Sequence, residues 1–149
     1  MIHPNKVIMS KALELAKKGY EESGFAIGAI IVKGDEIISQ GFNTSKKDSD
    51  PTAHAEIVAI RNACKKLGTR KLEDCYLYTT YEPCPMCASA TIWAKIKGII
   101  YGASGEDSSK THPWRVNISS EEVLKHGTPS VELYPEFMRE ECKNLLNLS

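Results

Sequence analysis

Apolar residues recur at helical spacing in several stretches of the chain. This spacing predicts a helix over residues 6–18, ended by Gly19, and another over residues 53–67, ended by Gly68. Asp50-Pro51-Thr52 is expected to cap the start of the second helix. An Ala-rich stretch after Pro83 predicts a third helix to about residue 94, and Pro135 is expected to open a last one.

Short runs of apolar and β-forming residues between these stretches predict the strands of one sheet. They lie at residues 27–32, 37–41, 75–80, 99–102 and 131–133. The first two are separated by Lys33-Gly34-Asp35-Glu36, where a glycine suits a tight hairpin turn. Because strands alternate with helices along the chain, we predict an α/β domain in which helices cover a sheet.

Length and composition limit the class of protein. A chain of 149 residues fits one domain spanning residues 1–149, and 42% hydrophobic residues are typical of a folded globular protein. The apolar stretch at residues 26–32 is far shorter than the roughly 20 residues of a membrane helix. The first residues lack a secretory pattern, so we expect a cytoplasmic protein without a membrane segment. Nineteen basic and nineteen acidic residues argue against a protein that binds nucleic acid mainly by neutralising phosphates.

The five cysteines divide into two groups. An odd number in a cytoplasmic chain fits a disulfide scaffold badly. Cys64, Cys75 and Cys142 stand alone, and we expect them to be buried free thiols. Cys84 and Cys87 form a Cys-x-x-Cys pair at the start of a predicted helix, which is a pattern that can bind a metal ion.

His54 completes the set of candidate metal ligands. Thiolates three residues apart lie on one helical face, and His54 can supply a third ligand from the start of the neighbouring helix. One His and two Cys favour tetrahedral zinc, and three protein ligands leave the fourth position for water, as in catalytic zinc sites. A redox pair or a four-ligand structural zinc is the alternative. The chain has no second Cys-x-x-Cys, and its other three histidines, at positions 3, 112 and 126, lack ligand-like spacing.

Glu56, two residues after His54, suits proton transfer better than zinc ligation. Zinc lowers the pKa of a coordinated water to about 7, and a neighbouring carboxylate can take that proton and pass it to a leaving group. The order His-x-Glu followed by Pro-Cys-x-x-Cys matches the signature of zinc-dependent deaminases.

The two motifs, Asp50-Pro51-Thr52-Ala53-His54-Ala55-Glu56 and Glu82-Pro83-Cys84-Pro85-Met86-Cys87, make the chain resemble the cytidine deaminase-like superfamily. The resemblance is to the branch of guanine deaminases, tRNA adenosine deaminases and fungal-type cytosine deaminases. It implies a three-layer α/β/α domain with a mixed five-stranded sheet. It also implies one Zn²⁺ per subunit, a homodimer or higher oligomer, and hydrolysis of an aromatic exocyclic amine to a carbonyl with release of ammonia.

The same resemblance implies roles for individual residues. His54, Cys84 and Cys87 would hold zinc, and Glu56 would move protons. The amide of Asn43 would contact the base, although a plain turn residue is the alternative. Backbone groups of Ala55 and of the Glu82-Pro83 turn would hold the base or the hydrated intermediate.

Other residues bear on the identity of the base. Ile92-Trp93-Ala94 and Phe25 resemble guanine deaminases, so Trp93 is a candidate pocket wall, with a place in the helix-to-sheet core as the alternative. His112-Pro113-Trp114-Arg115 stands where guanine deaminases carry Phe-Asp-Asp. Asp107, Trp114 and Arg115 are therefore candidates for substrate contact or for a structural role.

The end of the chain resembles tRNA adenosine deaminases, but its charge differs from what RNA binding requires. From Gly105 onward eight acidic residues face five basic ones. Five basic residues lie between positions 61 and 71, where a solvated helix face explains them equally well. We expect a zinc-dependent deaminase of a free purine base or nucleoside, guanine-like. The alternatives are a tRNA-specific adenosine deaminase, a cytosine or cytidine deaminase, and a non-catalytic zinc-stabilised subunit.

Overall fold

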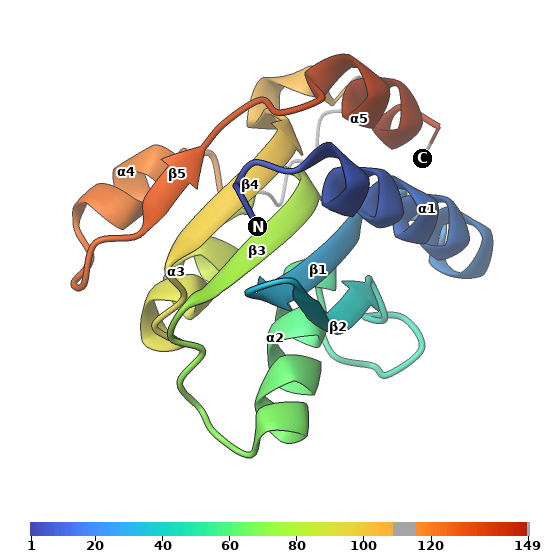
Figure 1. The fold of residues 1–149 in the computed structure, drawn as a ribbon. Helices are drawn as coiled ribbons and strands as arrows, with labels where there is room; N and C mark the ends of the chain where they lie inside the picture. Colours follow the sequence, from blue (N-terminus) through green and yellow to red (C-terminus); the bar gives the residue numbers. More distant parts are fainter. Residues whose placement is uncertain (109–115, 149) are drawn as a thin grey trace.

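The structure is a computed structural model that describes residues 1–108 and 116–148 (Figure 1). Helices and strands alternate along most of these residues, as the sequence pattern predicts. In chain order the elements are α1 (Lys6–Ser23), β1 (Gly28–Lys33), β2 (Glu36–Phe42), α2 (Ala55–Leu67), β3 (Cys75–Tyr81), α3 (Pro85–Trp93), β4 (Gly98–Ala103), the short 3-10 helix η1 (Gly105–Asp107), α4 (Ser120–Lys125), β5 (Glu132–Tyr134) and α5 (Arg139–Leu146).

The strands form one mixed five-stranded sheet in the order β2-β1-β3-β4-β5. Strand β1 is antiparallel to both of its neighbours, β2 and β3. Strands β3, β4 and β5 pair in parallel. Because β1 alone is reversed, the carboxyl ends of β2, β3, β4 and β5 lie at one edge of the sheet, together with the start of β1.

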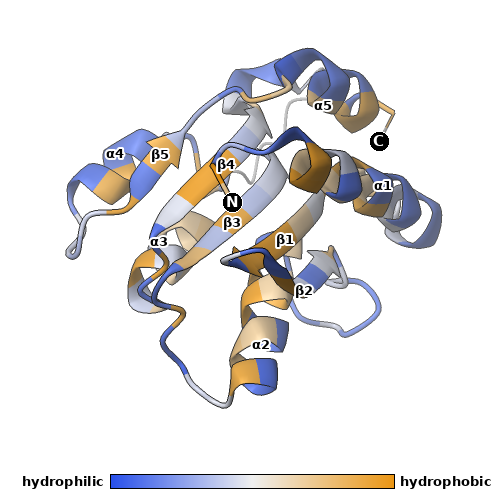
Figure 2. Cartoon of the chain, viewed as in Figure 1, coloured by the Kyte–Doolittle hydropathy of each residue, from blue (hydrophilic) through white to orange (hydrophobic). Residues whose placement is uncertain are grey.

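Helices cover the sheet on both faces, which confirms the predicted three-layer α/β/α architecture. One apolar cluster joins α1 and α5 to alternate residues of the strands, including Ile30, Tyr78 and Ile100. A second cluster joins α2 to the residues on the opposite face, including Ile31, Leu77 and Ile99. The strands are therefore apolar on both faces, and polar residues are concentrated on the outward sides of the helices (Figure 2).

Two glycines allow the helices to approach the sheet closely. A Cβ at Gly41 of β2 would lie 2.6 Å from the carbonyl oxygen of Ala55 and 2.8 Å from the nitrogen of Ala59, both in α2. A Cβ at Gly28 of β1 would collide with the carbonyl oxygen of Ala12 in α1. The backbone of α2, which starts directly after His54, is thus seated against the sheet itself.

The first helix is longer than its sequence predicts. It continues past Gly19 to Ser23 and ends at Gly24, which has the left-handed φ of 80°. Gly19 instead faces Phe42, where a Cβ would come within 2.8 Å of the Phe42 Cβ. This glycine permits a tertiary contact and does not terminate the helix. At the end of α2 the prediction is confirmed, because Gly68 has a φ of 66°.

The last helix is shorter than predicted. It begins at Arg139, and its N-cap Met138 has a left-handed φ of 56°, so the segment that starts at Pro135 is a turn. The single cysteines are unpaired as expected, with Cys75 and Cys142 buried and Cys64 half-buried. Among the described residues, no helix has the length and apolar character needed to cross a membrane.

An ion pair fastens α5 to the segment after β4. Arg139 donates through Nε and Nη2 to the two carboxylate oxygens of Asp107, both at 2.8 Å. The Asp107 side chain is 4% exposed and also accepts the N–H of Ser104 at 2.8 Å. The hydrogen bond from Arg139 is the main cause that lowers the pKa of Asp107 to about 2. Asp107 therefore has a structural role in this chain, the alternative to substrate contact.

This pair predicts a pH-dependent contribution to stability. Because the folded-state pKa of Asp107 lies below its ordinary value of 3.8, its contribution is full above about pH 4 and is lost as the pH falls through about 2. Asp107→Asn should lower the free energy of unfolding at pH 7 by about 1–3 kcal/mol, and the difference should shrink below pH 4. Urea unfolding from pH 7 to pH 2.5 measures it. Glu106→Gln, an 81% exposed neighbour of the same arginine, is the control and should have little effect.

Candidate active site

The predicted site residues come together at the carboxyl edge of the sheet. His54 is the N-cap of α2, and Cys84 is the N-cap of α3, which has Pro85 in its first turn. Neither side chain makes a capping hydrogen bond to its own helix. Both side chains line the same pocket, so the positive ends of both helices face it.

The loop that leads to His54 is fixed by Asp50. One carboxylate oxygen accepts the backbone N–H of Thr52 at 2.9 Å and its hydroxyl at 2.6 Å. The other accepts Nη1 of Arg61 at 2.9 Å, and the hydrogen bond from the Thr52 hydroxyl contributes most to a pKa of Asp50 lowered to about 2. The prediction that residues 50–52 cap α2 is wrong, because the helix starts later and these groups order the loop instead.

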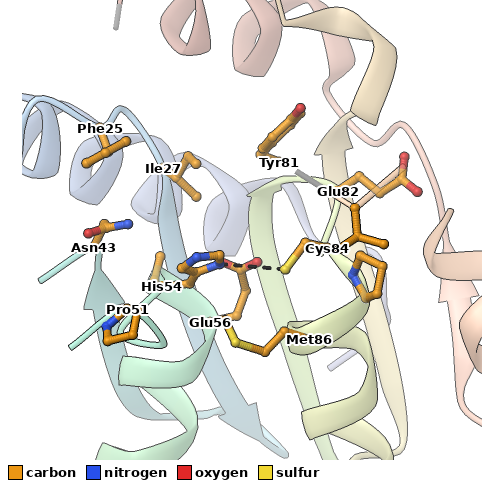
Figure 3. A pocket seen from close by; sticks show the side chains of 13 residues that line it. Phe25, Ile27, Asn43, Pro51, His54, Glu56, Tyr81, Glu82, Cys84 and Met86 are labelled. Atoms are coloured by element: carbon orange, nitrogen blue, oxygen red, sulfur yellow. Dashed lines mark hydrogen bonds between the residues drawn. The ribbon is translucent and has the colours of Figure 1, made fainter. Parts of the chain in front are cut away.

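Three side chains can hold one metal ion. Nδ1 of His54 lies 3.6 Å from Sγ of Cys84 and 3.5 Å from Sγ of Cys87, and the three ligand atoms all lie within 4.8 Å of one another (Figure 3). In tetrahedral zinc sites, Zn–N bonds of about 2.0–2.1 Å and Zn–S bonds of about 2.3 Å put nitrogen and sulfur about 3.5 Å apart. The soft donors and their spacing therefore fit zinc.

The two thiols differ in their protonation. A hydrogen bond from Cys87 is the main cause that lowers the pKa of Cys84 to about 4. The same hydrogen bond, followed by burial, raises the pKa of Cys87. A metal ion at this site must displace the proton between the two sulfurs, so its binding releases a proton and weakens as the pH falls.

Glu56 lies in the first turn of α2 and is 5% exposed. Its carboxylate lies beside the imidazole of His54 (Figure 3). Burial is the main cause that raises the pKa of Glu56 to about 7. A carboxyl group with such a pKa can both accept and return a proton near neutral pH.

A pocket of about 340 Å³ opens over these groups, within the usual size range for small-molecule sites. Apolar side chains form most of its walls, and polar groups converge at its base. The lining residues are Phe25, Ile27, Asn43, Pro51, His54, Ala55, Glu56, Tyr81, Glu82, Cys84, Pro85, Met86 and Val116.

Asn43 presents a defined hydrogen-bonding group to the pocket. It is 8% exposed, and its Oδ1 accepts the backbone N–H of Ser45 at 2.9 Å and the Ser45 hydroxyl at 2.7 Å. These two bonds orient the amide so that its nitrogen lies on the side of His54 (Figure 3). Asn43 therefore offers a donor to an acceptor atom of a ligand.

Some of the predicted substrate contacts line the pocket and others do not. Ala55 lines the pocket with Asn43, whereas Trp93 does not and is 82% exposed. The core position considered for Trp93 is wrong, because α3 buries Cys87, Ala88 and Thr91 and Trp93 falls on the other side of the helix. Trp114 and Arg115 lie outside the described residues.

Several pocket residues have no clear sequence signal. Tyr81 lies two residues before the Pro-Cys-x-x-Cys motif and Met86 lies within it, so their proximity to the metal ligands could be inferred from position alone. Val116 lies far from both motifs in sequence, and only the fold brings it to the pocket. The sequence also gives no signal for the position of the Glu82 carboxylate.

Comparison with known proteins identifies a shared domain. The family model described as the cytidine and deoxycytidylate deaminase zinc-binding region matches residues 3–103. A guanine deaminase of Bacillus subtilis (strain 168) is 45% identical over 107 residues, covering 71% of this chain and 69% of that protein. A tRNA-specific adenosine deaminase of Aquifex aeolicus (strain VF5) is 42% identical over 139 residues, covering 91% and 87%.

A solved structure extends the likeness to three dimensions. It comes from studies of A-to-I editing by tRNA:A34 deaminases and superposes with a TM-score of 0.82 at 31% identity. The match covers 95% of this chain and 100% of that chain. The architecture is therefore shared along nearly the whole length, including elements after the region that the family model matches.

The ligand geometry predicts the effect of removing one sulfur. Cys87→Ser should reduce bound zinc from about one per chain to a small fraction, because serine replaces a soft thiolate with a poorly ionised hydroxyl. Zinc content after dialysis against a mild chelator, measured by mass spectrometry, tests this. Cys64→Ser, a half-buried cysteine on α2 outside the cluster, should keep its zinc. Equal zinc content in the two variants would contradict the ligand assignment.

Proposed function

Because the chain belongs to the cytidine and deoxycytidylate deaminase family of zinc-binding proteins, we propose that it is a hydrolytic deaminase of a purine, taken as the free base or the nucleoside. Water would replace the exocyclic amine, leaving a ring carbonyl and ammonia. The two curated relatives described above are named for guanine and for adenosine, which supports a purine over a pyrimidine. By resemblance to the same family, we propose that the enzyme acts as a homodimer in the cytoplasm.

One observation carries this proposal. A cluster of one histidine and two cysteines lies at the base of an apolar pocket, with the buried carboxyl group of Glu56 beside it. A structural zinc site has its ligand positions filled by protein and needs neither a pocket nor a carboxylate. A redox pair of cysteines does not need a histidine in contact with both sulfur atoms. The combination supports hydrolysis at an open metal position.

The roles of the residues follow from their positions. His54, Cys84 and Cys87 would hold the zinc ion, which supplies Lewis acidity and a hydroxide nucleophile near neutral pH. An Oε atom of Glu56 would accept a proton from the attacking water and deliver it to the departing amine nitrogen. The buried position of the Glu56 carboxylate, next to the metal ligands, suits both transfers.

The remaining pocket groups would orient the substrate. Nδ2 of Asn43 would donate a hydrogen bond to a ring nitrogen or carbonyl of the base, both of which accept. The walls formed by Phe25, Ile27 and Met86 would bury the flat ring and exclude bulk water.

Charge supports a small substrate over a folded RNA. The segment from Gly105 onward carries eight acidic and five basic residues, which repels phosphates. The basic residues of α2 do not supply a compensating patch at the pocket. Arg61 pairs with Asp50 at 2.9 Å, and Lys65 and Lys66 lie in the last turn of α2, at the opposite end from His54.

A second candidate is deamination of adenosine in tRNA. Its support is the extent of the match, because the Aquifex aeolicus relative covers 91% of this chain whereas the guanine deaminase covers 71%. The shared region thus includes much of the chain after β4. This candidate requires contacts to RNA outside the pocket, and hence an activity that falls steeply with salt.

Ammonia release by the zinc-loaded protein tests the two candidates against each other. The panel contains guanine, adenine, cytosine, their nucleosides, and tRNA with adenosine at the wobble position. We expect turnover of a purine base or nucleoside that changes little between 50 and 300 mM salt. Turnover that requires tRNA and is lost over that salt range would replace the first candidate with the second. Zinc-loaded protein inactive on the whole panel would sink both.

Glu56→Ala tests the proton transfer. The variant should keep its zinc, because Glu56 is not among the three clustered ligands, and it should lose at least about 10²-fold in kcat. Glu73→Ala, an exposed glutamate remote in sequence from both motifs, is the control and should retain full turnover. A Glu56→Ala protein that releases ammonia at the wild-type rate would refute the assignment.

A further inference from the structure

Glu82 is a buried carboxylate immediately before the Pro-Cys-x-x-Cys motif. It is 8% exposed and stands at the end of β3, two residues before Cys84. Its side chain points away from His54 and Cys84 (Figure 3). Its role therefore differs from that of Glu56, whose carboxylate lies beside the metal ligands.

The two oxygens of Glu82 accept hydrogen bonds from two separate segments. Oε1 accepts the backbone N–H of Gly105 at 2.8 Å. Oε2 accepts the backbone N–H of Ser120 at 2.8 Å and the Ser120 hydroxyl at 3.2 Å. Gly105 closely follows β4, and Ser120 is the first residue of α4. One side chain thus binds both ends of the connection between β4 and α4.

Neighbouring bonds reinforce one end of this connection. The backbone N–H of Glu82 donates to the carbonyl of Ala103 at 2.8 Å, and the hydroxyl of Tyr81 donates to the carbonyl of Gly105 at 3.0 Å. Val116, four residues before Ser120, lines the pocket together with Tyr81. The strand that leads into the metal ligands is therefore tied to the segment that supplies another wall of the pocket.

Because the Glu82 carboxylate is buried, the carboxylate and the groups that donate hydrogen bonds to it depend on one another. A carboxylate taken out of water needs hydrogen-bond donors, and charge-assisted bonds to backbone N–H groups are among the strong ones. Glutamine in place of Glu82 would put an NH₂ group against one set of donors, leaving a buried N–H without an acceptor. The connection between β4 and α4 would then lose one of the hydrogen-bonded attachments that Glu82 provides.

We propose that Glu82 is a positioning residue that holds Gly105 and Ser120 in place, and through Ser120 the pocket wall at Val116, and thereby sets the affinity and selectivity for the substrate ring. In this proposal His54, Cys84 and Cys87 bind zinc and Glu56 transfers protons, and Glu82 does neither. The selectivity role rests on the proposed deaminase function. The attachment itself rests on hydrogen bonds that can be measured without turnover.

Glu82→Gln tests the proposal, with Glu73→Gln as the matched control at an exposed position. Zinc content should stay at the wild-type level. KM for the preferred base should rise about tenfold, the size expected for loss of one hydrogen bond to a charged group, with a smaller change in kcat. The ratio of kcat/KM between the two best bases of the panel should fall. A variant with unchanged KM and unchanged ratio would overturn the proposal, as would a loss of zinc in step with activity.

Amide hydrogen exchange separates this proposal from the proposed function. The N–H groups of Gly105 and Ser120 should exchange faster in Glu82→Gln than in the wild type, whereas amides in the core of β1 should not change. If the wild-type protein deaminates nothing, the selectivity role falls with the proposed function, and the exchange data still decide whether Glu82 holds the segment. Unchanged exchange at both amides would overturn the attachment.

Ser120→Ala provides a second variant should Glu82→Gln fail to fold. It removes only the hydroxyl contact and keeps the backbone N–H, so KM and the selectivity ratio should shift in the same direction by a smaller factor. Combined with Glu82→Gln it should add little, because both changes disrupt one interaction. Fully additive effects, or Ser120→Ala kinetics equal to wild type, would count against the proposal.

Discussion

The site depends on the common direction of β2, β3 and β4. Because β1 alone is reversed among the described strands, β2, β3 and β4 end at one edge of the sheet, and the residues directly after β2 and β3 line the pocket. Asn43 follows β2, Glu82 follows β3, and Gly105 follows β4. Parallel sheets with helices on both faces commonly bind ligands at this edge. The positions of Asn43 and Glu82 follow from that arrangement.

The same edge gathers two helix N-termini, and this determines the chemistry available. His54 and Cys84 occupy the N-cap positions of α2 and α3, so their side chains converge beyond the helix ends. The positive ends of the helices stabilise thiolate, the form in which cysteine binds zinc. Gly41 permits the close seating of α2 on the sheet that places His54 and Glu56. A side chain at this glycine would displace His54 and Glu56 together.

Local sequence signals predicted the parts of the molecule that depend on local interactions. The hairpin and the end of α2 at Gly68 could be inferred from spacing and residue type. The metal cluster joins residues 30 and 33 positions apart, and it could be predicted only because its two motifs together match a known signature. Features decided by distant contacts could not. The sequence predicts that Gly19 ends the first helix, but the structure shows that this glycine makes room for Phe42. A core position is considered for Trp93, but this residue lies on the outward side of α3 and is exposed. Glu82 belongs to a recognisable motif, but its partners lie 23 and 38 residues away.

The metal cluster and one wall of the pocket therefore come from different segments. The ligands and Glu56 come from two short motifs whose geometry is set by helix starts, whereas Val116 comes from a connection with no such motif. A guanine deaminase and a tRNA-specific adenosine deaminase both exceed 40% identity to this chain over the regions that match. Glu82 lies where the two segments meet, since its backbone leads into Cys84 and its carboxylate binds the connection. A change at Val116 or at the Glu82–Ser120 contact would then alter the pocket wall without changing a residue of the metal cluster.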